Sequence, residues 1–201
     1  MVKAWSVCVW LLLAVRPASP PVPFGGCIEY EHEYQTLAGD QLFFAVKPKS
    51  WLYVQGNNLK VYDRNKQLQE LYLGATNEYH RFDKGRPLPP TQASWPTDAA
   101  RLTCLSSTAT ILGYRCQMLQ LVQAGTSTLV FYAPELHVNA ADFSRCPSPG
   151  FYALLQATDG ALPLRTISVD TRRDVTATTE AIAVQPMTLA VAEFTATAPA
   201  R

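Results

Sequence analysis

Short apolar or alternating segments, separated by turn residues, make up most of this chain, and few stretches have a helical spacing. From residue 28 to residue 34, three glutamates alternate with Tyr30, His32 and Tyr34. In a strand this places the carboxylates on one face and the rings on the other. Residues 51–55 and 59–62 flank Gly56-Asn57-Asn58, whose residue types tolerate the positive φ of a hairpin turn. The pattern predicts an all-β fold, an antiparallel β-sandwich.

Further strands are predicted along the rest of the chain, at residues 41–46, 101–106, 111–122, 127–138, 151–157, 161–169, 175–184 and 187–196. Residues 74–100 contain four prolines and several basic side chains, so we expect an exposed loop there. The composition changes near residue 146, where large apolar residues become fewer. We therefore expect residues 20–145 to form the sandwich domain, and residues 146–201 to form either a β-rich extension or a small second domain.

Residues 1–19 have the features of a secretory signal peptide. Lys3 supplies a positive start, residues 4–15 form an apolar stretch, and Pro17-Ala18-Ser19 offers small residues for cleavage. An apolar stretch of this length makes about 18 Å of helix, against about 30 Å of membrane hydrocarbon. We therefore expect a secreted mature protein with no membrane anchor.

Cleavage after residue 19 would leave four cysteines, namely Cys27, Cys104, Cys116 and Cys146. An even number of cysteines in an exported chain predicts two disulfide bonds, and three pairings are possible. The whole chain of 201 residues has a formal net charge of +1. This argues against a dedicated nucleic-acid-binding protein, because such proteins carry a basic patch or stripe.

One stretch has a spacing of tyrosine and cysteine that is found in a known protein family. Tyr114 stands two residues before Cys116, and residues 38–44 read Ala-Gly-Asp-Gln-Leu-Phe-Phe. These features resemble the tyrosine corner and the start of the second strand of an immunoglobulin-like domain of the V/I type, over about residues 39–138. The resemblance implies an immunoglobulin-like sandwich in which Trp51 would be the core tryptophan.

The sequence departs from that family at its core disulfide. The family's first core cysteine should fall near Ala45 or Val46, where there is none. If the resemblance holds, Cys27 and Cys146 flank the domain and could tie its ends, which leaves Cys104 and Cys116 to pair with each other or with those two. A pairing of Cys27 with Cys104 is equally open.

Motifs for catalysis or metal binding are missing from the sequence. It contains no His-Glu-x-x-His, Cys-x-x-Cys or Gly-x-Ser-x-Gly. The tripeptide Glu31-His32-Glu33 does not predict a metal site, because neighbouring residues of a strand point to opposite faces. We expect a protein that is not an enzyme and that holds no metal or cofactor.

Aromatic and basic residues are interleaved between residues 47 and 95, and such side chains are common anchors of protein interfaces. The candidate ligand-binding residues are Trp51, Tyr53, Tyr79, Arg81, Phe82, Lys84, Arg86 and Trp95. Phe82 and Trp95 are expected to make the main contacts, because they lie in the proline-rich segment. The alternative is that alternate aromatic residues belong to the core and that the basic residues form a solvated face.

These observations favour a secreted, non-enzymatic binding protein that engages an extracellular protein ligand, such as a cytokine, a chemokine or a receptor. Without an anchor it could act as a soluble decoy or immune modulator. A second hypothesis is a β-sandwich that binds an acidic glycan, including a glycosaminoglycan, by stacking sugars on aromatic rings. A third is a subunit of a glycoprotein complex.

Overall fold

The computed structural model describes residues 22–42, 47–89, 101–123, 125–146 and 151–195. The strands of this part of the chain are β1 (Gly26–Gln35), β2 (Lys49–Gln55), β3 (Asn58–Tyr62), β4 (Leu68–Leu73), β5 (Glu78–Asp83), β6 (Arg86–Pro87), β7 (Arg101–Ile111), β8 (Tyr114–Gln123), β9 (Thr126–His137), β10 (Ala161–Asp170) and β11 (Val175–Pro186). The helices are the 3-10 helix η1 (Ala140–Phe143), the α-helix α1 (Phe151–Ala157) and the 3-10 helix η2 (Val191–Glu193).

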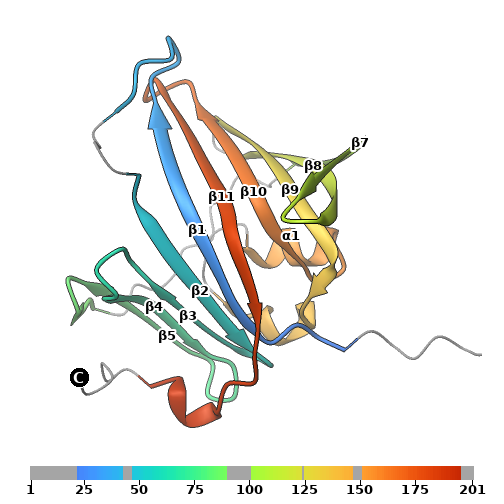
Figure 1. Ribbon diagram of the computed structural model, residues 1–201. Coiled ribbons are helices and arrows are strands. Elements are labelled where there is room, and N and C mark those ends of the chain that lie inside the picture. Colours follow the sequence, from blue (N-terminus) through green and yellow to red (C-terminus); the bar gives the residue numbers. More distant parts are fainter. Residues whose placement is uncertain (1–21, 43–46, 90–100, 124, 147–150, 196–201) are drawn as a thin grey trace, which may run out of the picture.

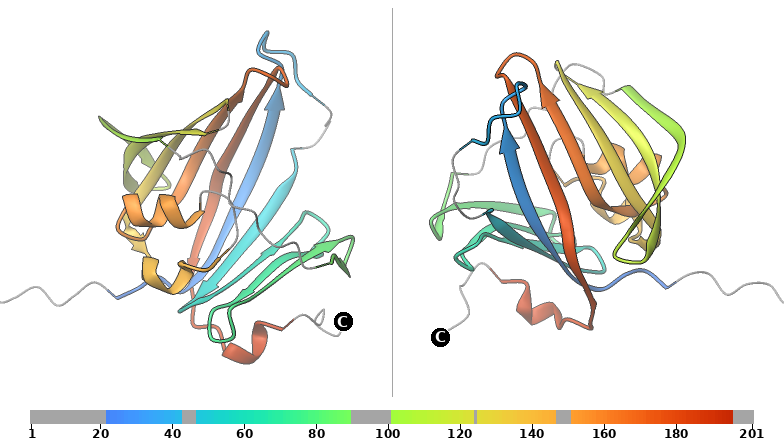
Figure 2. Two further views of the ribbon diagram at one scale, coloured as in Figure 1. Left: turned by 180° about the vertical axis from the view of Figure 1, so that it is seen from behind. Right: turned by 45° about the horizontal axis from the view of Figure 1, so that its top comes forward.

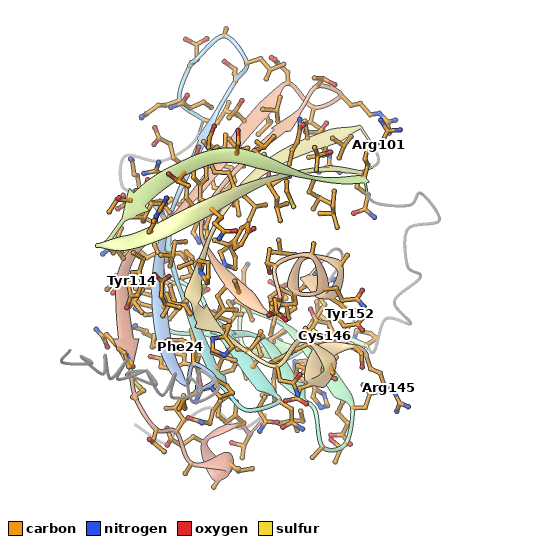
Figure 3. All side chains as sticks on the ribbon, turned by 90° about the vertical axis from the view of Figure 1, so that its right-hand side faces the viewer. Phe24, Arg101, Tyr114, Arg145, Cys146 and Tyr152 are labelled. Atoms are coloured by element: carbon orange, nitrogen blue, oxygen red, sulfur yellow. The ribbon has the colours of Figure 1, made fainter. Side chains whose placement is uncertain are left out.

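All the strands belong to one antiparallel sheet with the order β6-β5-β4-β3-β2-β1-β11-β10-β9-β8-β7. Strands β1 to β6 form one meander and β7 to β11 form a second, and the two meanders meet where β11 pairs with β1. The sheet is strongly curved, so that its β7–β9 limb and its β2–β5 limb lie on either side of α1 (Figures 1 and 3). The predicted all-β, antiparallel, sandwich-like fold is confirmed.

The inner face of the curve carries the main hydrophobic core. Ile28 of β1 and Leu164 of β10 are fully buried there, and α1 and η1 cover them from the same side (Figure 2, left). Phe143 of η1 lies between Tyr72 of β4 and Phe151 of α1, with ring centroids 5.9 Å and 5.8 Å away. In Figure 3, Tyr152 marks α1 inside the curve, and Arg101 and Tyr114 lie at opposite ends of the β7–β8 band. The helices thus fill the space that the curved sheet encloses.

The local pattern predicted several strands correctly. Strand β1 covers the alternating segment, and its outer-face Glu29 and Glu33 pair with Lys49 and Lys47, each at 2.9 Å. The predicted hairpin at Gly56 is formed by β2 and β3, and Gly56 has a φ of +56°. Strands β8, β9, β10 and β11 also lie where strands were predicted, although a turn at residues 112–113 separates β8 from β7.

Two segments differ from the prediction because tertiary contacts decide their conformation. Residues 151–157 form α1 rather than a strand; Leu155 packs into the main core, and Thr158 Oγ1 donates a hydrogen bond to the Leu154 carbonyl at 2.9 Å. A short apolar run does not distinguish a buried strand from a buried helix. Residues 187–195 form no strand, and their one regular element is η2.

The proline-rich segment and the segment after β1 also differ from what the sequence predicted. Strands β5 and β6 lie within residues 74–100, which were expected to form a loop, because β5 pairs along β4 from Glu78 to Arg81. Residues 90–100 lie outside the described part. Of the predicted strand at 41–46, Gln41 makes an isolated bridge with Gln35, and residues 43–46 are not described.

The C-terminal segment is built into the same sheet as the rest of the chain. Strand β11 pairs with β1 along ten residues of β1, and β10 pairs with β9. The strands of residues 146–201 therefore lie in the middle of the sheet. The division of the chain at residue 146 into a sandwich domain and an extension or second domain stays a prediction.

The two predicted disulfide bonds are not present in the structure, where all four cysteines of the described chain are thiols. Cys27, Cys116 and Cys146 are buried, and Cys104 is exposed on β7. Across the β7–β8 ladder Cys104 lies opposite Leu119, and Cys116 lies opposite Ala109, so these two cysteines do not face each other.

The immunoglobulin-like resemblance, which rests on Tyr114 and Cys116 of β8, stays a prediction. No helix among the described residues is long and apolar enough to cross a membrane.

Candidate functional site

The outer face of β2 and β3 gathers aromatic and basic side chains. In the ladder between these strands Tyr53 lies opposite Lys60, and Trp51 lies opposite Tyr62. The two-residue turn of the hairpin sets this register, and the strand period of two puts all four residues on one face. From β1, Cys27 lies beside Tyr53 in the neighbouring ladder.

A C-terminal segment covers part of this face. Residues 187–195, which we call the strap, follow β11 and run below the β2–β5 limb in Figure 1. The Met187 N–H donates to the Gly25 carbonyl at 3.0 Å, and the Leu189 N–H donates to Gln55 Oε1 at 3.1 Å. The strap's buried side chains belong to a second hydrophobic cluster, which consists of Leu68, Leu71, Phe82, Leu189 and Phe194.

Lys60 is a buried cation between the sheet and the strap, with an exposed fraction of 7%. Its Nζ donates to the Glu193 carbonyl at 3.0 Å and lies 5.2, 5.6 and 5.1 Å from the ring centroids of Tyr53, Tyr62 and Phe194. Burial lowers the pKa of Lys60 from its ordinary value. Cation–π contacts and one carbonyl therefore replace part of the water that this ammonium lost.

A second cation reaches the same place from the turn between β3 and β4. Asp63 Oδ1 accepts hydrogen bonds from the N–H groups of Asn65 and Gln67 at 2.8 Å and 2.9 Å, and Lys66 takes a φ of +58° in this turn. Lys66 Nζ lies 2.9 Å from the ring centroid of Trp51. Burial lowers the pKa of Lys66 as well. The turn chemistry of Asp63 thus positions a lysine over the outer face.

These residues enclose a half-open cavity of about 420 Å³, which we call the lysine pocket. Its walls are Tyr53, Lys60, Tyr62 and Lys66 from the sheet, and Ala192, Glu193 and Thr195 from the strap. The Glu193 carboxylate accepts a hydrogen bond from the Ala190 N–H at 2.9 Å, and its charge offsets part of the lowering of the Lys60 pKa. Burial raises the pKa of Tyr53 to about 12, so at neutral pH this side chain is a neutral phenol. The pocket therefore suits an anionic group.

The cysteine beneath the pocket does not suggest nucleophilic chemistry. Cys27 lies beside Tyr53 in the β1–β2 ladder and is 3% exposed. Burial raises the pKa of the Cys27 thiol. A protonated, buried thiol is a poor nucleophile.

The structure brings one of the predicted ligand-binding residues into the wall of the lysine pocket and a second beside it, and it places the others elsewhere. Tyr53 lines the pocket, and Trp51 lies under Lys66. Phe82 is 6% exposed in the second hydrophobic cluster, and Tyr79 packs against the main core. Phe82 is a core residue because it lies on β5, not in a loop. The remaining candidates are Arg81, exposed on β5, Lys84 and Arg86, exposed at the β5–β6 turn, and Trp95, which lies outside the described residues.

Lys60, Tyr62 and Lys66 belong to the interleaved residues but are not among the predicted ligand-binding residues. A signal was present, because the predicted hairpin pairs Tyr53 with Lys60 once its turn is placed at residues 56–57. No local pattern in the sequence predicts that the strap lies beside Lys60, because the hydrogen bond from Lys60 to Glu193 joins residues 133 positions apart.

His32 lies on the inner face, away from the lysine pocket. Its Nδ1 and Nε2 are hydrogen-bonded to Thr179 Oγ1 and Ser50 Oγ at 2.9 Å and 2.8 Å. Among the described residues no group of three or more His, Cys, Asp or Glu side chains could hold a metal ion.

We expect acid to weaken the fold through His32. Burial lowers the pKa of His32 below its ordinary value of 6.5, so the unfolded chain takes up the proton first as the pH falls. The stability that this residue contributes is complete above pH 6.5 and is lost as the pH falls toward the lowered pKa. Urea unfolding between pH 8 and pH 5 should show a smaller loss for His32→Asn than for the unchanged chain. An imidazole titration by NMR with a midpoint at or above 6.5 would contradict this explanation.

Comparisons with known proteins assign no family to the chain. No family model matches it, and no curated protein matches it. Its fold is similar to that of PNGF-II, with a TM-score of 0.46 and 14% identity over 82% of this chain and 29% of that one.

Two further similar structures are more distant. MucB in complex with MucA(peri) has a TM-score of 0.30 and 11% identity, over 80% of this chain and 50% of that one. A domain of a putative outer membrane lipoprotein-sorting protein from Vibrio parahaemolyticus has a TM-score of 0.33 and 11% identity, over 87% of this chain and 91% of that one. The chain thus spans less than a third of PNGF-II and half of MucB.

Proposed function

We propose that this chain is a secreted, non-enzymatic binding protein, which engages a partner protein through an anionic group held in the lysine pocket. One observation carries the proposal. Lys60 is 7% exposed as a residue, and it borders a cavity that a second lysine also lines. Of its three N–H donors, one meets an oxygen acceptor among the described residues.

A carboxylate in this pocket would complete the hydrogen bonding of Lys60 and neutralise part of the local charge. Hydrogen bonds between charged partners are about twice as strong as neutral ones. The walls contributed by Tyr53 and Tyr62, which meet edge to face at 5.7 Å, would add apolar contact area. Because both tyrosines and Lys60 lie on paired strands, little side-chain ordering is needed on binding.

The class of partner follows from the predicted export of the chain. A secreted binding protein would meet extracellular proteins, such as a cytokine, a chemokine or a receptor, and would act as a soluble decoy or immune modulator. The anionic group would then be an Asp or Glu side chain, or the carboxylate at the end of the partner chain.

Substitution of the two lysines tests the proposal. A labelled hexaglutamate peptide serves as the probe for binding to the full chain. We expect Lys60→Met to weaken binding about thirtyfold or more, because the loss of one partner of a buried charge pair costs about 2 kcal/mol or more. We expect a smaller loss for Lys66→Met.

Lys84→Met is the matched control, since Lys84 is exposed at the β5–β6 turn. It removes the same charge and should leave binding nearly unchanged. Methionine fills much of the volume of lysine, and thermal melting would verify that Lys60→Met is folded. Binding that is as strong in folded Lys60→Met as in the unchanged chain would refute the proposal.

An acidic glycan is the second candidate ligand, because aromatic rings lie beside both lysines. Three rings contact Lys60, and the Trp51 ring contacts Lys66. Sugar rings stack on such side chains, and sulfates would pair with the ammonium groups. If a sulfated oligosaccharide binds more tightly than hexaglutamate and loses affinity in Lys60→Met, the glycan becomes the favoured ligand.

A further inference from the structure

The geometry of the strap points to a partner for the outer face: we propose that a peptide segment with the strap's own pattern binds there in trans and displaces residues 187–195. The inference rests on the proposed function in one respect, since both use Lys60. The strap shows which chemistry this surface accepts. It places one aliphatic anchor, Leu189, and one aromatic anchor, Phe194, in the second hydrophobic cluster, where their exposed fractions are 8% and 3%.

The second half of the strap is not a strand of the sheet. The N–H groups of Glu193 and Phe194 donate to the carbonyls of Ala190 and Val191, at 2.9 Å and 3.0 Å, inside the strap itself. Its contacts with the sheet include the buried Phe194 ring and the Glu193 carbonyl on Lys60. Side-chain anchors of this kind can be exchanged without breaking a ladder of backbone hydrogen bonds.

The strap also leaves the site incompletely occupied. It offers Lys60 a neutral carbonyl oxygen, while the Glu193 carboxylate bonds to the Ala190 N–H. The cavity of about 420 Å³ remains beside it, bordered by Lys66. A segment with the same two anchors and a carboxylate directed at the lysines would make the strap's contacts and add an ion pair.

The partner segment is therefore defined by its chemistry. It contains an aliphatic residue, an aromatic residue five positions later, and an acidic residue just before the aromatic one, with a 3-10 turn between the two anchors. The strap competes with it from within the same chain, at the high effective concentration of a tethered ligand.

A peptide of residues 187–195, Met-Thr-Leu-Ala-Val-Ala-Glu-Phe-Thr, is the probe for this inference. It is labelled and titrated into the full chain and into Phe194→Ala, in which the internal strap has lost its aromatic anchor. We expect the peptide to bind Phe194→Ala at least tenfold more tightly than it binds the unchanged chain. Binding to the double variant Phe194→Ala, Lys60→Met should be weaker than binding to Phe194→Ala.

Val191→Ala is the matched control, because Val191 lies in the strap and is 72% exposed. It should bind the peptide as the unchanged chain does. Leu189→Ala is a second way to loosen the strap if Phe194→Ala does not fold. Equal peptide binding by the unchanged chain and by a folded loosened variant would overturn the inference.

The hexaglutamate probe separates this inference from the proposed function. If the strap is a permanent wall of the pocket, Phe194→Ala will bind hexaglutamate no better than the unchanged chain, and Lys60 will still be required. The inference would then fail while the proposed function stands. If hexaglutamate binding does not depend on Lys60, while the strap peptide binds the loosened variant, the proposed function fails and the displaceable strap stands.

Discussion

Gly160→Ala is expected to destabilise the protein by about 3 kcal/mol or more. Gly160 has a φ of +82°, and a β-carbon at this position would lie 1.8 Å from the carbonyl oxygen of Val138. The glycine also donates its N–H to the Leu155 carbonyl at 2.7 Å and accepts from the Val138 N–H at 2.9 Å. Gly160 therefore follows the end of α1 and joins the end of β9 to the start of β10. Movement of Leu155 or Val138 away from an added β-carbon would break one of these two backbone hydrogen bonds.

Gly85→Ala is the control that separates crowding from backbone strain. Gly85 also has a positive φ, +76°, but nothing lies within 4 Å of its β-carbon position. Its substitution should cost about 1 kcal/mol, the strain of a left-handed alanine alone. Urea unfolding of both variants measures the difference, and equal losses would show that the contact with Val138 relaxes easily.

Phe143→Ala is expected to cost about 3–5 kcal/mol, the range for an aromatic residue removed from a core. Phe143 is fully buried, and its ring contacts both Tyr72 and Phe151. The loss would leave a cavity where η1 and α1 meet the sheet. The midpoint of urea unfolding and the near-ultraviolet circular dichroism spectrum should both change.

Two further substitutions serve as controls for Phe143→Ala. Phe143→Leu keeps most of the volume and should cost clearly less than Phe143→Ala. Leu112→Ala removes a side chain that is 47% exposed and should cost about 0.5 kcal/mol or less. A loss for Phe143→Ala as small as that for Leu112→Ala would mean that the helices are not part of the cooperative core.

Local sequence patterns were enough to predict the strands that carry the lysine pocket. The alternation around Tyr30 and His32 predicted β1, and the turn at Gly56 predicted the β2–β3 hairpin. Both signals depend on residues close together in the chain, namely a period of two and a two-residue turn. Of the pocket, Tyr53 was therefore identified. Lys60 was not selected, although the register of the hairpin pairs it with Tyr53.

The same kind of reasoning failed for residues 151–157 and for Phe82. An apolar run of seven residues fits a strand or a helix, and the core that accepts Leu155 determines which one forms. Phe82 was assigned to a loop because of the prolines that follow it, but pairing of β5 with β4 placed it in a hydrophobic cluster. In both cases the deciding contacts come from other parts of the chain.

The sequence by itself determined that the chain is built of antiparallel strands, that one face of β1 is acidic, and that β2 and β3 form a hairpin. Only the tertiary structure decided that β11 lies beside β1, that the strap covers the outer face, and that Lys60 is buried beneath Glu193 and Phe194. Strand period and turn chemistry act between near neighbours. The contact between Lys60 and the strap joins positions 133 residues apart, and it forms only because the sheet brings β3 and the end of β11 to the same face.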